Sequence, residues 1–270
     1  MKTKLLLSLF MLACSLQSLA QVKANNLNSQ ILGTWKIISM TGTETNGKPF
    51  KTDLTKVNQY KIITATHWMY LNYDTDSLRG GGDAGTYELK GNKYIEALTD
   101  NYKTDFTVKV EGDKYYQDGN VIFPDGKKLA LHEVYQRVPE PANATSDVLG
   151  TWNMTAYTIA RDGKKVEEKG VTELQIYTPT HSMWIDKKDG RFWMGMLSSY
   201  KREGNKIIAK PIIASFPIDA NDKEDVTATV KGNQMTSTVK VVKANGKTEE
   251  WNMVHQRVGK TKLVKAVATK

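Results

Sequence analysis

The sequence predicts an all-β protein made of two tandem antiparallel β-barrels. One observation behind this prediction is an internal repeat, in which residues 31–35 (ILGTW) recur as residues 148–152 (VLGTW). The other is a succession of short segments with alternating or β-branched character, separated by turns that contain glycine. This pattern is typical of sandwiches and barrels, and the repeat places it in the chain twice.

The repeat continues in the same order along both units. Further matching pairs are 64–67 (TATH) with 178–181 (TPTH), 91–93 (GNK) with 204–206 (GNK), and 136–138 (QRV) with 256–258 (QRV). The segment between the units contains two prolines and small polar residues, which favour an extended linker. The predicted division is a first barrel at 21–138, a linker at 139–147, a second barrel at 148–258 and a basic C-terminal tail at 259–270.

Strand patterns within each unit agree with a barrel. Residues 151–157 alternate in polarity, as a half-buried strand should. Residues 60–64 and 174–178 are rich in β-branched and aromatic side chains, and Pro179 ends the second of these segments. No segment shows an apolar stripe at helical spacing over three turns, except for a short piece near Asp53 to Tyr60 that is a candidate helix.

The first 20 residues are predicted to be a signal peptide. Lys2 and Lys4 precede a short apolar run, and small residues end at Ala20. We therefore expect an exported protein, periplasmic or extracellular. Lipid attachment at Cys14 is an alternative, although Met11 stands where such a site favours leucine. Cleavage after Ala20 removes the single cysteine, and no later run is long enough for a membrane span.

The formal charge of +9 is spread along the chain, apart from the basic tail. Proteins that bind nucleic acid gather their charge on one face or stripe, so we expect no nucleic-acid partner. A solvated basic surface is the simplest interpretation. Attraction to an envelope protein or an anionic glycan is the alternative.

The first unit resembles the lipocalin-like domains of unknown function that Bacteroidetes export. The resemblance is carried by the Gly-x-Trp opening at residues 33–35, by residues 61–69 (KIITATHWM) and 85–87 (GTY), and by residues 133–138 (EVYQRV). The second unit is more divergent but keeps Gly150, Trp152, His181, Tyr200 and Arg257. The resemblance implies antiparallel barrels with a central cavity, and it leaves the ligand open because a fold does not fix a function.

Two tryptophan–arginine pairs are predicted to close the barrels. The first and last strands of a barrel meet, so Trp35 can stack on Arg137, and Trp152 on Arg257. In lipocalins a similarly placed pair plugs the closed end. A guanidinium over an indole contributes about 0.5–2 kcal/mol, so we expect a structural role, with ligand binding as the alternative.

No catalytic or metal-binding pattern is present. The sequence lacks a nucleophile elbow and a phosphate loop, and its four histidines (His67, His132, His181 and His255) show no ligand spacing. We expect His67 and His181 to begin strands, and we expect no enzyme activity, cofactor or metal. Residues 80–82, a glycine run flanked by aspartates, are predicted to form a flexible hairpin tip.

The contrast between the units suggests where a ligand binds. Alternate residues of the last strand share a face with the closing arginine, so this face is expected to line the interior. The candidate ligand-binding residues are Glu96, Glu133 and Tyr135 in the first unit, and Trp184, Trp193, Met196, Trp251 and Met253 in the second. The acidic residues need partners, and Arg137 is expected to pair with Glu133.

Three functions are open to this sequence. The first is a binding module that holds a small apolar or amphipathic molecule in a barrel cavity. The second is a structural or interaction protein of the cell envelope whose barrels are filled by their own side chains. The third is an enzyme, which a carboxylate pair of raised pKa in a cleft would favour.

Overall fold

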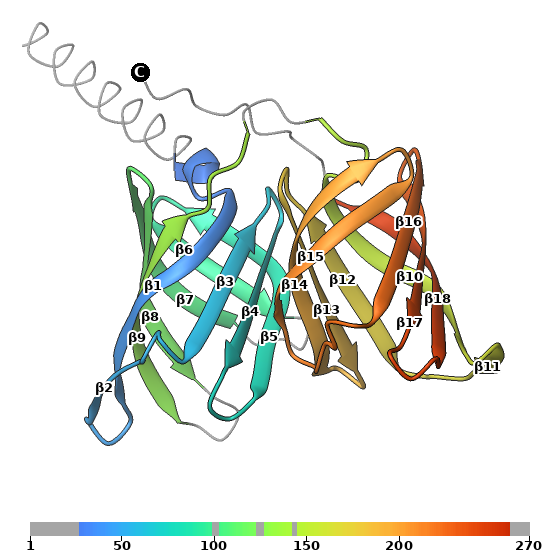
Figure 1. Ribbon diagram of the computed structural model, residues 1–270. Coiled ribbons are helices and arrows are strands. Elements are labelled where there is room, and N and C mark those ends of the chain that lie inside the picture. The colour runs from blue at the N-terminus through green and yellow to red at the C-terminus, as the bar shows by residue number, and fades with distance from the viewer. Residues whose placement is uncertain (1–26, 99–102, 123–126, 142–144, 260–270) are drawn as a thin grey trace, which may run out of the picture.

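Two closed barrels lie side by side in the computed structural model (Figure 1). The structure describes residues 27–98, 103–122, 127–141 and 145–259. The predicted signal peptide, lipid-attachment alternative and most of the tail lie outside these residues. The all-β tandem-barrel prediction is confirmed.

Each barrel has eight wall strands and one short additional strand that extends a hairpin. The first barrel contains β1 (Gly33–Glu44), β2 (Pro49–Lys51), β3 (Val57–Ile63), β4 (His67–Asp74), β5 (Arg79–Lys90), β6 (Lys93–Leu98), β7 (Lys103–Glu111), β8 (Lys114–Ile122) and β9 (Lys128–Arg137). The second contains β10 (Gly150–Arg161), β11 (Lys164–Val166), β12 (Val171–Tyr177), β13 (His181–Lys188), β14 (Arg191–Glu203), β15 (Lys206–Ala214), β16 (Lys223–Lys231), β17 (Gln234–Val242) and β18 (Thr248–Val258).

Both barrels close by antiparallel pairing of their first and last long strands. β1 pairs with β9, and β10 pairs with β18. A bulge interrupts each closing ladder at the same place, after Ile37 in β1 and after Met154 in β10. Corresponding registers make the two lumens comparable position by position.

The barrels pack through an apolar interface between β3–β5 and β12–β15 (Figure 1). This interface consists of Tyr60, Ile62, Met69, Leu71, Ala84, Ile176, Met183, Ile185, Leu197 and Ile213, all buried. Strand β3 therefore has two buried faces, one toward the lumen and one toward the other barrel. This explains why residues 59–63 are all buried, without the alternation that a half-exposed strand shows.

The interface has approximate two-fold symmetry. Thr34 Oγ1 lies 3.2 Å from Thr178 Oγ1, and the equivalent pair, Thr151 and Thr64, lies at the same separation. The salt bridge between Lys187 Nζ and Asp83 Oδ1, 2.7 Å long, also joins the barrels.

Residues 80–82 belong to this interface, so their prediction as a flexible hairpin tip is wrong. They lie within β5, where a Cβ on Gly80 would stand 2.5 Å from Ser215 Cβ of the second barrel. The absence of side chains allows the second barrel to approach the backbone of β5.

One end of each barrel is covered by the stacked pairs. The Arg137 guanidinium lies 4.0 Å from the Trp35 ring centroid, and Arg257 lies 4.0 Å from Trp152. Arg137 also donates to the carbonyls of Leu32 (2.7 Å) and Gln30, beside a helical turn at residues 27–30. We refer to the opposite end of each barrel as its mouth.

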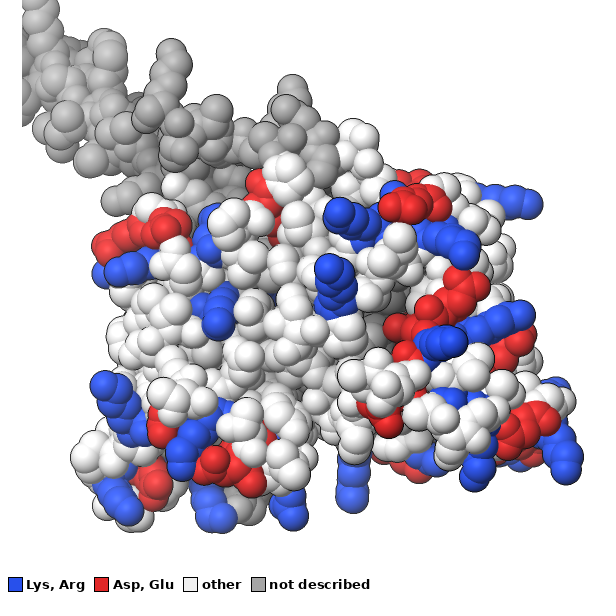
Figure 2. Space-filling model, viewed as in Figure 1, with Lys and Arg blue, Asp and Glu red and all other residues white. Residues whose placement is uncertain are grey.

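The wall of the second barrel is incomplete toward its mouth. β15 and β16 pair only at Lys206–Thr227 and Ile207–Val226, after which the strands separate. Figure 2 shows this side of the second barrel as a hollow edged by acidic and basic side chains. The corresponding strands β6 and β7 pair over five residues of each strand.

Within the described ranges, no helix has the length and apolar character needed to cross a membrane.

Candidate functional site

The lumen of the second barrel contains the candidate site. Met183 and Ile185 of β13 face the first barrel, so the alternate residues Trp184 and Asp186 face the lumen. The same argument places Ser198 of β14 in the lumen, because its neighbour Leu197 is at the interface. On β18, His255 shares the lumen face with the closing Arg257.

Two carboxyl groups and an imidazole meet in this lumen. Glu173 of β12 pairs in register with Asp186 of β13, and their carboxyl groups are close enough to share a hydrogen bond. Glu173 Oε1 lies 2.6 Å from His255 Nε2. All three residues are buried. The cluster offers one acid–base pair and a second carboxyl group beside it.

Burial determines the protonation of this cluster. Desolvation raises the pKa of Asp186 from 3.8 to about 9, and the negative charge of Glu173 adds to the shift. Two neighbouring buried carboxyl groups cannot both ionise without a large cost, so they hold one proton between them at neutral pH.

Four buried polar atoms of this lumen have no hydrogen-bond partner in the described part of the chain. They are Asp186 Oδ1, Ser198 Oγ, Ser237 Oγ and His255 Nδ1. Ser198, which pairs in register with Ser182, lies nearer the closed end than Asp186 does. Ser237 faces the lumen because it pairs with Met253 on the face that His255 also shares. Leaving a buried polar atom unpaired costs about 1–3 kcal/mol, so four of them in one lumen point to a polar group that binds there.

Four of the five residues predicted to line this barrel share the lumen face. Trp184 pairs in register with Met196, and Trp251 and Met253 precede His255 on β18. Trp184, Trp251 and Met253 are only partly buried although they face inward, so solvent reaches them through the mouth. Trp184 stacks on Phe216 of the loop beside the mouth, with ring centroids 5.8 Å apart.

Trp193, the fifth predicted residue, lies at a bulge near the mouth. The β13–β14 register shifts between Asp186 and Lys187, which leaves Trp193 without a register partner. Its ring lies 5.2 Å from Lys188 Nζ, and that ammonium also bonds to Glu168. Trp193 is therefore a rim residue beside an ion pair.

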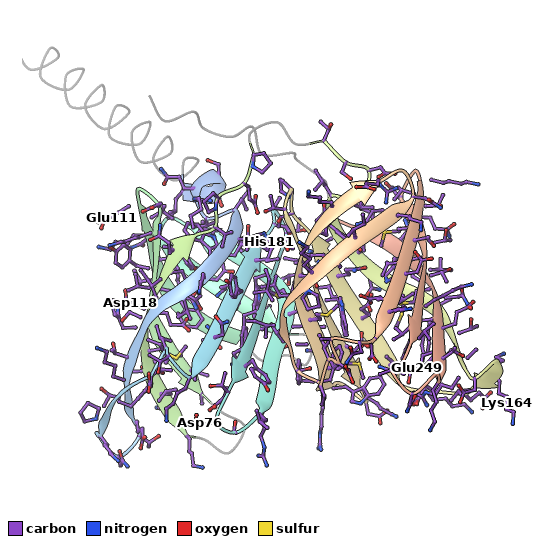
Figure 3. All side chains as sticks on the ribbon, in the orientation of Figure 1. Asp76, Glu111, Asp118, Lys164, His181 and Glu249 are labelled. Atoms are coloured by element: carbon purple, nitrogen blue, oxygen red, sulfur yellow. The ribbon has the colours of Figure 1, made fainter. Side chains whose placement is uncertain are left out.

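A pocket of about 560 Å³ lies over the mouth of the second barrel. Its lining comes from the ends of β10 and β18 and from the loops after β15 and β17, and it is mainly polar and charged. Glu249 of this pocket and the nearby Lys164 are labelled at the mouth end in Figure 3.

The lumen of the first barrel contains an internal ion pair. Lys61 of β3 bonds to Glu96 and donates to Gln117 Oε1 at 2.7 Å. Its ammonium lies 5.4 Å from the ring centroids of both Trp68 and Tyr94. Lys61 is 2% exposed, and this contact with the aromatic faces stabilises its charge.

The three predicted binding residues of the first barrel belong to this internal network. Gln59 Nε2 donates to Tyr135 Oη at 2.8 Å and to Glu133 Oε1 at 3.3 Å, and Gln117 Nε2 donates to Glu133 Oε2 at 3.1 Å. Burial raises the pKa of Glu96 and of Glu133, and Lys61 opposes both shifts.

The expected pairing of Arg137 with Glu133 is wrong. Arg137 turns toward the closed end and donates to backbone carbonyls there. Glu133 is satisfied by two glutamine amides. Arg137 and Glu133 are on the same face of β9, but their side chains point to different partners.

No group of three or more His, Cys, Asp or Glu side chains in the described ranges is arranged to hold a metal ion. His67 and His181 begin β4 and β13, where each ring Nδ1 lies 2.7 Å from the hydroxyl of the preceding threonine. Their burial lowers the pKa of both rings.

The sequence interpretation missed Lys61, Glu173, Asp186 and Ser237, and it gave His255 no role in binding. For Lys61, Glu173 and Asp186 the available signal was a charged residue in a strand that is rich in apolar side chains. For His255 the available signal was its position in the repeat, which is that of Tyr135 in the first unit.

No protein-family model matches the sequence, and no curated protein matches it. Among solved structures, a protein of unknown function from the DUF3598 family of Nostoc punctiforme is similar over 85% of this chain and 97% of its own, with 11% identity and a TM-score of 0.30. An uncharacterized protein from Saccharomyces cerevisiae is similar over 84% of this chain and 97% of its own, with 11% identity and a TM-score of 0.46. Neither similarity indicates a function, so the function of this chain is inferred from its two lumens.

Proposed function

We propose that this protein is a binding module that holds a small, partly apolar ligand in the second barrel. The observation that carries the proposal is the set of unpaired polar atoms beside partly exposed tryptophan and methionine side chains in one lumen. Ligand sites typically combine an apolar lining with a few polar groups that orient the ligand. The first barrel, whose buried lysine and glutamates have partners within the lumen, serves as a structural partner in this proposal.

The apolar part of the proposed site is tested by a matched pair of substitutions. Met253 and Glu133 occupy equivalent positions, because Ser237 pairs with Met253 as Gln117 pairs with Glu133. Met253→Glu should weaken binding of a fluorescent polyene or fatty-chain probe at least about tenfold, or about 1.4 kcal/mol. Glu133→Met, in the first barrel, should leave the affinity unchanged. Equal affinities for the wild type and Met253→Glu would show that the methionine and tryptophan residues are only core.

Catalysis is a second candidate, favoured by one specific observation. Asp186 has a raised pKa and lies beside Glu173, which contacts His255. Such an arrangement suits proton transfer. The two functions are separated by incubating the protein with a bound ligand and recovering that ligand for mass spectrometry. An unchanged mass supports binding, whereas a protein-dependent change that is lost in Glu173→Gln supports catalysis.

Membership of the exported lipocalin-like family of Bacteroidetes is also a proposal. It is supported by the Gly-x-Trp openings and by the segments shared with that family. Export through a signal at residues 1–20 predicts a mature chain that begins at Gln21. N-terminal sequencing of the protein from its source tests this cleavage, and a lipid-modified Cys14 would contradict it.

A further inference from the structure

The two barrels differ at one lumen position beside the closing tryptophan. Trp35 pairs in register with Lys61, and Trp152 pairs in register with Gln175. Lys61 supplies the buried ammonium of the first barrel. In the second barrel a neutral amide, whose Nε2 donates to Tyr177 Oη at 2.9 Å, takes its place.

The groups that hold the Lys61 ammonium are also replaced. Glu96 pairs in register with Tyr87 in the first barrel. At the equivalent position of the second barrel, Ala209 pairs with Tyr200. Gln117 pairs in register with Glu133, and at the equivalent position of the second barrel Ser237 pairs with Met253. Each replacement is a smaller side chain, and the second lumen therefore lacks both the lysine and its two binding groups.

Two carboxyl groups replace amides in the same lumen. Gln59 and Asn72 pair in register in the first barrel, and Glu173 and Asp186 pair at the equivalent positions. Buried carboxylates require a compensating positive charge or a proton. Without a lysine, the second barrel meets this requirement with a proton on the carboxyl pair and with the contact between Glu173 and His255, and a bound cation would replace that proton.

We propose that the second barrel binds a primary amine with an apolar chain, with the ammonium at Asp186 and Glu173 and the chain directed along Met253 and Trp251 to the mouth. This inference rests on the proposed function and specifies its ligand class. An ammonium has three donors and no acceptor. Asp186 Oδ1 and the Ser237 hydroxyl are unpaired acceptors of the kind it requires.

The same chemistry ranks other head groups below an amine. A carboxylate would be repelled by Glu173 and would need Asp186 to keep its proton. An alcohol can bond to Ser237 but supplies no positive charge. The first barrel, in which Lys61 lies between Glu96 and the aromatic rings, shows the arrangement that an ammonium adopts in a closely related lumen.

Titration calorimetry of the full chain at pH 8 tests this inference with three ligands of one chain length. These are dodecylamine, dodecanol and dodecanoate, each below the concentration at which it self-associates. We expect the amine to bind at least about tenfold more tightly than the alcohol, and the acid to bind most weakly. Asp186→Asn should weaken the amine at least about tenfold and leave the alcohol unchanged. Asp76→Asn, which removes an exposed carboxylate at the mouth of the first barrel, is the matched control.

Gln175→Lys provides an independent second variant. It returns a lysine to the position of Lys61, and this internal ammonium should compete with the amine and abolish its binding. Thermal melts monitored by circular dichroism establish that each variant is folded before its titration is interpreted.

The failures of the two proposals are distinguishable. Amine and alcohol binding of equal strength, an amine affinity unaffected by Asp186→Asn, or tighter binding of the acid would overturn the amine inference and leave the binding function in place. Failure of all three ligands to bind the folded wild type would overturn both.

Discussion

Leu71 of the first barrel packs against Gly195 of the second, where a Cβ would stand 3.2 Å from Leu71 Cδ1. The reciprocal approach is that of Ile185 to Gly82, where a Cβ would stand 3.0 Å from Ile185 Cδ1. These pairs relate the two repeats across the interface, so each barrel presents the same combination of an apolar side chain and a bare backbone. The interface therefore resembles that of a symmetric dimer, contained within one chain.

Gly195→Val tests this close approach. The added side chain meets Trp184 O as well as Leu71, and both are fixed by packing. We expect the free energy of unfolding to fall by about 1–3 kcal/mol, as measured by urea denaturation. Thr229→Val, at an exposed strand position away from the interface, should be nearly neutral. Equal stability of the two variants would mean that the barrels adjust freely to one another.

Substitution of the closing arginines is expected to lower the stability of the protein and to leave its affinity for a ligand nearly unchanged. Arg137→Ala removes the stack on Trp35 and the bonds to Leu32 and Gln30, and Arg257→Ala removes their counterparts on Trp152. Each substitution should lower the free energy of unfolding by about 1–3 kcal/mol. Probe affinity should remain within a factor of about two. A large loss of affinity at unchanged melting temperature would instead assign these arginines to the ligand site.

The fold could be predicted because the repeat and the turn pattern are local in the sequence. The candidate site could be predicted only in its apolar part. Trp251 and Met253 share the strand parity of the closing Arg257, and this parity is sufficient to place them in the lumen. Trp184 and Met196 stand out as large side chains, but their apolar neighbours Met183 and Leu197 face the first barrel.

The polar part of the site depended on knowledge of both faces of a strand. Residues 59–63 and 173–177 lie between a lumen and the interface, so their apolar residues face both ways and parity alone does not identify the inner face. The sequence pattern therefore does not distinguish Lys61 and Glu173 from exposed polar residues of a strand. Their burial became apparent only when the packing of one barrel on the other was known.

Lys61→Met tests the internal ion pair of the first barrel. The substitution keeps most of the side-chain volume but leaves Glu96 buried without its cation, and the pKa of Glu96 is already raised by burial. We expect a loss of about 3–5 kcal/mol in the free energy of unfolding. The double variant Lys61→Met with Glu96→Gln should recover at least half of this loss. Additive losses in the double variant would contradict a direct coupling between the two groups.

The protonation of Asp186 predicts a pH dependence of stability. Its pKa is about 9 in the folded protein, against an ordinary value of 3.8, because burial and Glu173 disfavour its charge. A folded-state pKa above the unfolded value means that the contribution to stability is complete below about pH 4 and is lost as the pH rises through about 9. The wild-type protein should therefore become less stable between pH 5 and pH 9. Other titratable groups face this lumen or its rim. They include Glu173, His255, Glu224, Lys188 and Glu168, and, at the mouth, Arg161, Asp162, Asp219, Asp222, Lys243, Lys247 and Glu249.

Asp186→Asn isolates this contribution, because an amide is neutral at every pH and the groups around it remain. Glu96 and Glu133 also have raised pKa values and act in the same direction, so the difference between variant and wild type is the informative quantity. This difference in the free energy of unfolding should shift in favour of the variant by at least about 1.4 kcal/mol from pH 5 to pH 9, the equivalent of one pKa unit. Urea denaturation at both pH values measures it, with Asp76→Asn as the exposed control. Parallel pH profiles for Asp186→Asn and the wild type would show that Asp186 is ionised throughout, and that the carboxyl pair already has a compensating charge.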